Sequence, residues 1–198
     1  MRKLLLFIPA AVILFTMCTQ TILEKTDNGV IIKLKSGSSD IPKLMKLEIL
    51  NDEIIHVLAS PEKKFSEEKS LCVIDRDYPD PSFNVKQEKD TLIISTGWII
   101  AKVSIVTGQV IFCDQNEKVI LSERPGGGKS FAPLTVEGTD GYTLGQAFDS
   151  PSDEAFYGLG QHQSDEFNYK GLNESLYQYN TKVSVPFIVS SRYYGILW

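Results

Sequence analysis

The side chains most able to contact a ligand lie close together in the stretch FYGLGQHQSDEFNYKG, residues 156–171. They include the amides of Gln161 and Asn168, the imidazole of His162 and the phenol of Tyr169. A few fixed polar groups beside a flat apolar face are typical of pockets that bind small polar molecules. The stretch therefore predicts that these four residues bind substrate, and the alternative is that they only tie neighbouring parts of the protein together.

Two acidic residues of the same stretch, Asp165 and Glu166, do not predict a catalytic pair. Adjacent residues in a strand or loop point in different directions, so the two carboxyl groups cannot face the same bond of a substrate. His162 and Asp165 do not predict a metal site either, because no third ligand accompanies them. We therefore expect this stretch to bind rather than to catalyse.

Other motifs match metal, phosphate or dinucleotide sites only in part. Asp75, Asp77 and Asp80 form an acidic loop, but they lack the spacing and the distal glutamate of a calcium-binding loop. The GKS at 128–130 lacks the first glycine of a phosphate-binding loop, and the GLG at 158–160 lacks the third glycine of a dinucleotide fingerprint. We expect no metal and no cofactor.

The cysteines give no support for a zinc site, because the chain has no CxxC motif and no Cys/His cluster. Cys72 and Cys113 both have apolar neighbours in the sequence. They can form a disulfide in an exported protein or remain as two buried thiols, and the sequence leaves both alternatives open.

The N-terminal segment is typical of an export signal, because Arg2 and Lys3 precede an apolar run that is too short for a comfortable membrane span. We interpret residues 1–17 as a lipoprotein-type signal peptide, Cys18 as the lipid attachment site and residues 18–28 as a tether. Ordinary cleavage nearby is the alternative, because Met17 replaces the usual small residue. The expected location is the periplasm or outer membrane, with membrane contact through the lipid anchor only.

Composition and charge narrow the class of protein. The chain has 198 residues, of which 42% are hydrophobic, and this is enough for one sizeable core. The net charge is −5 and no Lys/Arg block is present, so nucleic-acid binding is not expected.

Between the tether and the polar stretch the chain reads as a series of short strands. Apolar and β-branched runs alternate with turns such as Asn51-Asp52 and Thr107-Gly108, and no helical period is sustained. The pattern predicts an all-β, antiparallel β-sandwich over residues 29–198. The expected strands include 29–35, 44–50, 54–60, 91–95, 98–108, 109–114 and 118–123.

The C-terminal segment resembles a known family. The pieces FYGLGQ, NYKG, YQYNT, VPFIVSS and YYGILW occur in order over residues 156–198. In that order they resemble the end of the N-terminal domain of glycoside hydrolase family 31, in particular Bacteroides-type α-xylosidases and α-glucosidases. The resemblance implies a galactose-mutarotase-like β-sandwich and a carbohydrate substrate, an α-linked xylosyl or glucosyl oligosaccharide from plant or dietary material.

The resemblance also implies that catalysis occurs elsewhere. In this family a catalytic barrel follows the sandwich and carries both catalytic aspartates, whereas this chain ends at Trp198. No residue of the chain is therefore expected to be catalytic, and the chain alone is expected to be inactive. The resemblance implies that a loop from this region reaches the sugar pocket of the barrel. α-Xylosidase activity is favoured over α-glucosidase activity, and a stand-alone carbohydrate-binding module or an inactive remnant is the alternative.

Overall fold

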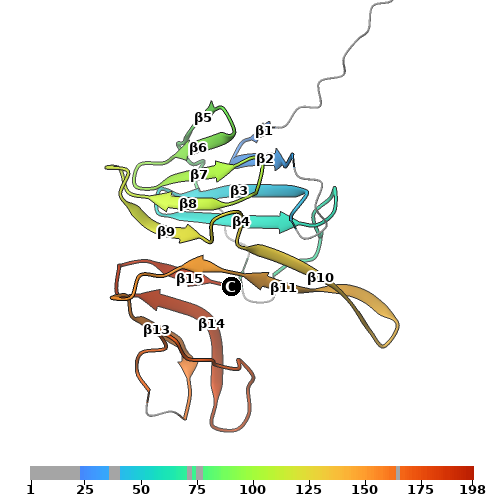
Figure 1. The fold of residues 1–198 in the computed structure, drawn as a ribbon, viewed down its shortest axis with the longest axis vertical. Helices are drawn as coiled ribbons and strands as arrows, with labels where there is room; N and C mark the ends of the chain where they lie inside the picture. Colours follow the sequence, from blue (N-terminus) through green and yellow to red (C-terminus); the bar gives the residue numbers. More distant parts are fainter. Residues whose placement is uncertain (1–22, 36–40, 71–72, 75–77, 164–165) are drawn as a thin grey trace, which may run out of the picture.

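The computed structural model describes residues 23–35, 41–70, 73–74, 78–163 and 166–198, and Figure 1 shows their arrangement. Every helix or strand in this part of the chain is a β-strand, and all strand pairs are antiparallel, which confirms the predicted class. The described residues contain no helix long and apolar enough to cross a membrane. Cys18, Cys72, Asp75, Asp77 and Asp165 lie outside the described residues.

The first sheet has the order β1-β2-β3-β4. Its strands are β1 (Leu23–Thr26), β2 (Gly29–Lys33), β3 (Leu44–Asn51) and β4 (Ile54–Ser60). β1 lies inside the range 18–28 that was expected to be a tether, yet it pairs with β2 in register from Leu23 opposite Ile32. The sandwich therefore begins earlier than Gly29, because LEKT has a neighbouring strand edge to pair with.

The second sheet has the order β12-β9-β8-β7-β6-β5. Its strands are β5 (Asn84–Glu88), β6 (Thr91–Ser95), β7 (Ile100–Ser104), β8 (Val110–Cys113), β9 (Val119–Glu123) and β12 (Phe148–Asp149). The turn from β7 to β8 requires Gly108, whose φ of 74° is strained for residues with a side chain. The predicted Thr107-Gly108 turn therefore lies where the sequence placed it.

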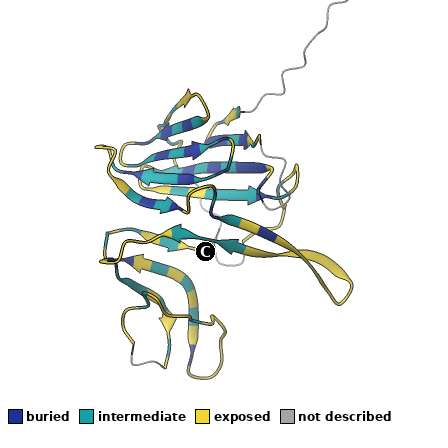
Figure 2. Ribbon diagram, viewed as in Figure 1, coloured by how far each residue is buried: buried dark blue, intermediate teal, exposed yellow. Residues whose placement is uncertain are grey.

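The core lies between these two sheets, which stack as the layers of a sandwich in Figures 1 and 2. Alternate residues of each strand point inward, as the period of two requires. The fully buried members are at most 1% exposed: Val30, Ile32, Met45, Leu47, Ile49, Leu92, Ile94, Ala101, Val103, Ile105 and Val110. Burial of apolar surface at about 25 cal/mol per Å² makes this cluster the main source of stability.

The remaining strands form two smaller units that lie outside this core. β10 (Lys129–Val136) and β11 (Thr139–Gln146) form a hairpin that projects from the sandwich in Figure 1. β13 (Phe156–Gln161), β14 (Val183–Ser190) and β15 (Gly195–Leu197) form a three-stranded sheet with β14 in the centre. We call the latter the C-terminal sheet.

Candidate functional site

The predicted binding residues lie on the C-terminal sheet and on the long loop between β13 and β14, residues 162–182. Glycines shape the strand that leads into this loop. Gly158 and Gly160 have φ values of 111° and 98°, and a Cβ at Gly160 would lie 2.1 Å from the carbonyl oxygen of Val183. Only glycine fits this backbone, so the GLG motif serves the close approach of β13 to β14.

His162 points into the loop rather than toward solvent, and its side chain is 2% exposed. Its Nε2 lies 2.6 Å from the carbonyl oxygen of Leu159 and donates a hydrogen to it. Its Nδ1 lies 3.3 Å from Oε1 of Glu174 and has no hydrogen-bond partner in the part of the chain that the structure describes. His162 is therefore fixed to the start of the loop through Leu159 and lies beside Glu174 in the middle of the loop.

Glu174 is also held by a lysine from the far end of the loop. The Nζ of Lys182 lies 2.5 Å from Oε1 of Glu174 and donates a 2.8 Å hydrogen bond to the carbonyl oxygen of Ser175. The hydrogen bond between the two side chains raises the pKa of Lys182 and lowers the pKa of Glu174. We call His162, Glu174 and Lys182 the loop clasp, because they come from the beginning, middle and end of one loop and lie next to one another.

Tyr177 and Tyr179 form an aromatic pair beside the clasp. Their rings are stacked with centroids 5.6 Å apart and an interplanar angle of 21°. Lys182 lies 4.7 Å from the centroid of the Tyr177 ring, an arrangement in which the ring face attracts the cation. Both tyrosines are more than half exposed, so this pair offers an aromatic surface to solvent.

The other predicted residues have different surroundings. Asn168 accepts backbone hydrogen bonds from Phe156 at 2.9 Å and from Lys170 at 3.0 Å, so its carbonyl oxygen ties the loop to β13. The ring of Tyr169 lies edge-on to His162, with centroids 6.1 Å apart. Gln161 is exposed at the end of β13. The structure thus brings His162 and Tyr169 together, uses Asn168 within the fold and leaves Gln161 accessible.

Sequence reasoning missed Glu174 and Lys182 as members of this site. They lie 12 and 20 positions after His162 on a loop without regular structure, and no local spacing marks them as neighbours. A charge-paired Glu and Lys within an aromatic-rich loop is the only local signal, and it is a weak one.

A second polar cluster holds the C-terminal sheet to the segment before it. Glu154 is 3% exposed, and its Oε1 accepts 2.5 Å hydrogen bonds from Ser190 and from the phenol of Tyr194. Its Oε2 accepts a hydrogen bond from Ser150 at 2.8 Å. Burial opposes the ionised form, but the three hydrogen bonds outweigh it and lower the pKa of Glu154. Burial, together with the bond to Glu154, raises the pKa of Tyr194.

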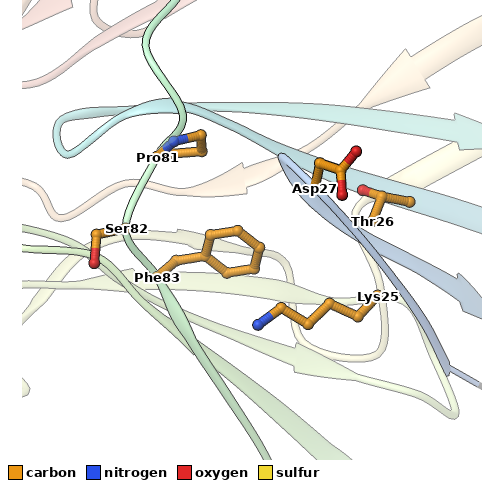
Figure 3. Close-up of a pocket in the computed structure, with 6 residues that line it drawn as sticks. All are labelled: Lys25, Thr26, Asp27, Pro81, Ser82 and Phe83. Atoms are coloured by element: carbon orange, nitrogen blue, oxygen red, sulfur yellow. The ribbon is translucent and has the colours of Figure 1, made fainter.

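The hollows of the described surface include the following two. One, of about 560 Å³, is an open depression where Lys25 lies 4.8 Å from the ring of Phe83, and Figure 3 shows it beside Asp27. The other, of about 490 Å³, lies between the second sheet and the C-terminal sheet and is lined largely by apolar side chains such as Phe156 and Trp198. Neither is lined by any of the four predicted binding residues.

Metal and thiol chemistry have little support in the described residues. No group of three or more His, Cys, Asp or Glu side chains there could hold a metal ion. Cys113 is a buried free thiol, and burial raises its pKa, which disfavours the reactive thiolate. The site is thus a polar loop on a β-sheet scaffold.

The fold and site together define an antiparallel β-sandwich domain that carries a clasped polar loop on a small C-terminal sheet. Residues 44–198 match the family model of the glycosyl hydrolase 31 N-terminal galactose mutarotase-like domain. The match covers most of the chain, and the chain belongs to this family.

Individual relatives agree with this assignment. The chain is 30% identical to an α-xylosidase of Saccharolobus solfataricus over 167 residues, which cover 78% of this chain and 22% of that protein. The crystal structure of the GH31 α-xylosidase from Xanthomonas citri is similar with a TM-score of 0.81 and 40% identity, over 88% of this chain and 18% of that one. A GH31 α-xylosidase from a soil metagenome, solved in complex with xylose, gives a TM-score of 0.70 and 25% identity, over 90% of this chain and 28% of that one. The chain therefore spans between 18% and 28% of the length of these relatives.

Proposed function

We propose that this chain is the non-catalytic N-terminal domain of a retaining α-glycosidase that hydrolyses α-linked xylosyl oligosaccharides, in preference to glucosyl ones. The observation that carries the proposal is the match of residues 44–198 to the family's N-terminal domain, together with α-xylosidase relatives at 30% and 40% identity. A retaining glycosidase needs two carboxyl groups about 5–5.5 Å apart across the scissile bond. The buried carboxylate Glu154 is fully engaged in hydrogen bonds within the fold, and we assign it no catalytic role.

The test begins with the coding sequence after Trp198. An open reading frame that continues into a catalytic barrel supports the proposal, and a stop codon contradicts it. The protein made from the complete gene should hydrolyse nitrophenyl α-xyloside faster than the α-glucoside, whereas residues 18–198 alone should show no turnover. Activity of the short chain that is lost on mutating one of its own residues would refute the non-catalytic role.

Within this function, we assign the loop 162–182 to the rim of the substrate pocket. In this proposal Gln161 and Tyr169 contact sugar hydroxyls, Asn168 anchors the loop, and His162 is a positioning residue that acts through the clasp. In the complete enzyme we expect His162→Ala to lower kcat/KM by a factor that corresponds to about 1–3 kcal/mol, because the polar groups that it fixes lose their partners.

The chain offers a matched control for this substitution. His56 on β4 is the second histidine of the chain and also pairs with a glutamate, with Nδ1 2.8 Å from Oε2 of Glu48. His56→Ala should leave kcat/KM unchanged. If His162→Ala lowers thermal stability but leaves kcat/KM unchanged, the loop only connects neighbouring parts of the protein and does not contribute to substrate binding.

A stand-alone carbohydrate-binding module is the second candidate, and the exposed Tyr177–Tyr179 pair favours it. Sugar rings pack on aromatic faces, and Tyr179 is 51% exposed where it stacks on Tyr177. Calorimetric titration of residues 18–198 with xylo-oligosaccharides tests whether the chain alone is such a binding module. Binding that Tyr179→Ala abolishes would favour the module, and an absence of binding would exclude it.

We further propose export with lipid attachment at Cys18, on the basis of the N-terminal sequence alone. Cells expressing the protein should incorporate labelled palmitate into it and retain it in the membrane fraction. Cys18→Ala should remove both properties. An unlabelled and soluble wild-type protein would contradict the proposal.

A further inference from the structure

Lys170, which follows the proposed sugar contact Tyr169, has its ammonium group among the oxygens of another segment. Its Nζ donates hydrogen bonds to the carbonyl oxygens of Ser150 and Pro151, at 3.2 and 2.7 Å, and to the hydroxyl oxygen of Ser150. An ammonium group has three N–H donors, and these three acceptors can engage all of them. Nζ also lies 5.4 Å from the centroid of the Phe156 ring. Lys170 therefore ties the loop to the segment that precedes β13.

The hydroxyl of Ser150 extends this tie to the buried carboxylate of Glu154. Ser150 accepts the hydrogen bond from Lys170 and donates one of 2.8 Å to Oε2 of Glu154. A hydroxyl has one hydrogen to donate, so the bond to Glu154 leaves the oxygen lone pairs to the lysine. Oε1 of Glu154 accepts hydrogen bonds from Ser190 at the end of β14 and from Tyr194 before β15. Lys170, Ser150 and Glu154 thus connect the loop to the C-terminal sheet, and we call them the loop anchor.

The backbone around Tyr169 is fixed at the same place. The N–H of Tyr169 donates a 2.9 Å hydrogen bond to the carbonyl oxygen of Phe156, and Asn168 accepts one from the N–H of Phe156. Asn168 and Lys170 therefore both reach toward the scaffold, whereas the ring of Tyr169 between them packs edge-on against His162. Attachment on both sides determines where the Tyr169 side chain lies.

We propose that Lys170 is a positioning residue for substrate binding, because it holds the phenol of Tyr169 in place by joining the loop to Glu154. The proposal rests on the proposed function, in which Tyr169 contacts a sugar hydroxyl. Charge-assisted hydrogen bonds are about twice as strong as neutral ones, so an ammonium group holds the loop more firmly than a neutral side chain does. A displacement of about 1 Å in a group that positions substrate can lower the rate by about 100-fold.

A double-mutant cycle in the protein from the complete gene tests this role. Lys170→Met keeps a long side chain and removes all three donors, whereas Tyr169→Phe removes only the phenol hydroxyl. Each single variant should lower kcat/KM for nitrophenyl α-xyloside by about 10-fold, which corresponds to one hydrogen bond to the substrate. In the Tyr169→Phe background, Lys170→Met should lower kcat/KM by less than about 2-fold, because the contact that Lys170 positions is already absent.

Lys35→Met is the control for loss of a lysine that holds an acceptor. The Nζ of Lys35 lies 2.6 Å from Oδ1 of Asp90, and the change should leave kcat/KM as it is in both backgrounds. Equal losses from Lys170→Met in the two backgrounds would overturn the proposal, because a merely structural lysine lowers activity whether or not the phenol is present. An unchanged kcat/KM in Lys170→Met would also overturn it.

Hydrogen exchange without substrate measures the loop anchor independently of turnover. The amide of Tyr169 should exchange about 10-fold faster in Lys170→Met than in wild type, because its hydrogen bond to Phe156 then opens more often. Ser150→Ala removes the hydroxyl between Lys170 and Glu154, so it should give a smaller increase and provides a second cycle with Tyr169→Phe. Equal exchange at Tyr169 in wild type and Lys170→Met would overturn the proposal.

The two measurements separate this proposal from the proposed function. If the complete protein does not hydrolyse α-xylosides but Lys170→Met still accelerates exchange at Tyr169, the proposed function is wrong and the loop anchor stands. If the complete protein hydrolyses α-xylosides and Tyr169→Phe leaves kcat/KM unchanged, the sugar contact of Tyr169 is wrong and the positioning role of Lys170 is overturned with it.

Discussion

Strands β3 and β14 carry similar alternating patterns and have opposite environments. In β3, Met45, Leu47 and Ile49 are at most 1% exposed, because the second sheet packs against them. In β14, the residues Val183, Val185 and Phe187 alternate with the same period and remain 41–51% exposed. The difference shows that alternation determines which residues share a face, whereas burial depends on whether another layer covers that face.

A buried ion pair joins the second sheet to the β10–β11 hairpin, and we expect its disruption to have the largest effect. The side chains of Lys129 and Glu123 are 8% and 4% exposed, and Glu123 also accepts a 3.0 Å hydrogen bond from the backbone N–H of Val110. Burial lowers the pKa of Lys129, and the attraction of Glu123 offsets only part of this effect. Lys129→Met leaves a buried carboxylate without its cation and should lower the free energy of unfolding by about 3–5 kcal/mol.

Urea denaturation at pH 7 measures this loss. Lys86→Met is the control, because it breaks the exposed pair with Glu88 and should leave the urea midpoint unchanged. Equal midpoints for Lys129→Met and wild type would show that the buried pair does not stabilise the fold.

The core of the sandwich should show the next largest effect. Leu47→Ala removes a fully buried side chain between the two sheets and should lower the free energy of unfolding by about 2–5 kcal/mol, which combines lost transfer energy and the cavity left behind. Thermal and urea unfolding of the same variant check this value. A loss below 1 kcal/mol would contradict the assignment of the core.

Acid should weaken the C-terminal sheet through Glu154. Its pKa in the folded state lies below the ordinary value of a glutamate, so its stabilising contribution is complete above that ordinary value and is lost as the pH falls through the folded pKa. Glu154→Gln keeps the shape but loses the charge-assisted hydrogen bonds, and it should cost about 1.5–3 kcal/mol at pH 7 and less at pH 3.

Urea midpoints measured at both pH values test this prediction. Glu62→Gln, which changes an exposed carboxylate after β4, is the control and should show the same pH dependence as the wild type. A cost of Glu154→Gln that does not shrink toward pH 3 would contradict the role of the charge.

The exposed face of β14 that carries Val185 should show the smallest effect in residues 18–198. Val185→Thr keeps the β-branched shape and changes only an exposed surface, so the free energy of unfolding should change by less than about 0.5 kcal/mol. The comparison with Leu47→Ala in the same urea series then separates the covered face from the open one. A loss as large as that of Leu47→Ala would show that the face belongs to the core of this chain.

The sequence by itself determined the class and most of the strands. Runs such as LMKLEIL and TLIIS alternate strongly and appear in the structure as β3 and β6, because a period of two fits only a half-buried strand. The polar run NVKQE and the run LEKT gave no such signal, yet they form β5 and β1 by pairing with β6 and β2. The family resemblance, carried by residues 156–198, was likewise readable from the sequence and is confirmed by the family match.

Only the tertiary structure decided how the polar loop is held. The sequence marked His162 and Asn168 as polar groups near each other, but it could not show that His162 turns inward to Leu159 and Glu174. It also gave no reason to join Glu174 with Lys182, because a loop has no fixed period that relates residues eight positions apart. Local pattern fixes which residues share a face of a strand, whereas contacts within a loop and the covering of an open face depend on chain segments that are distant in sequence.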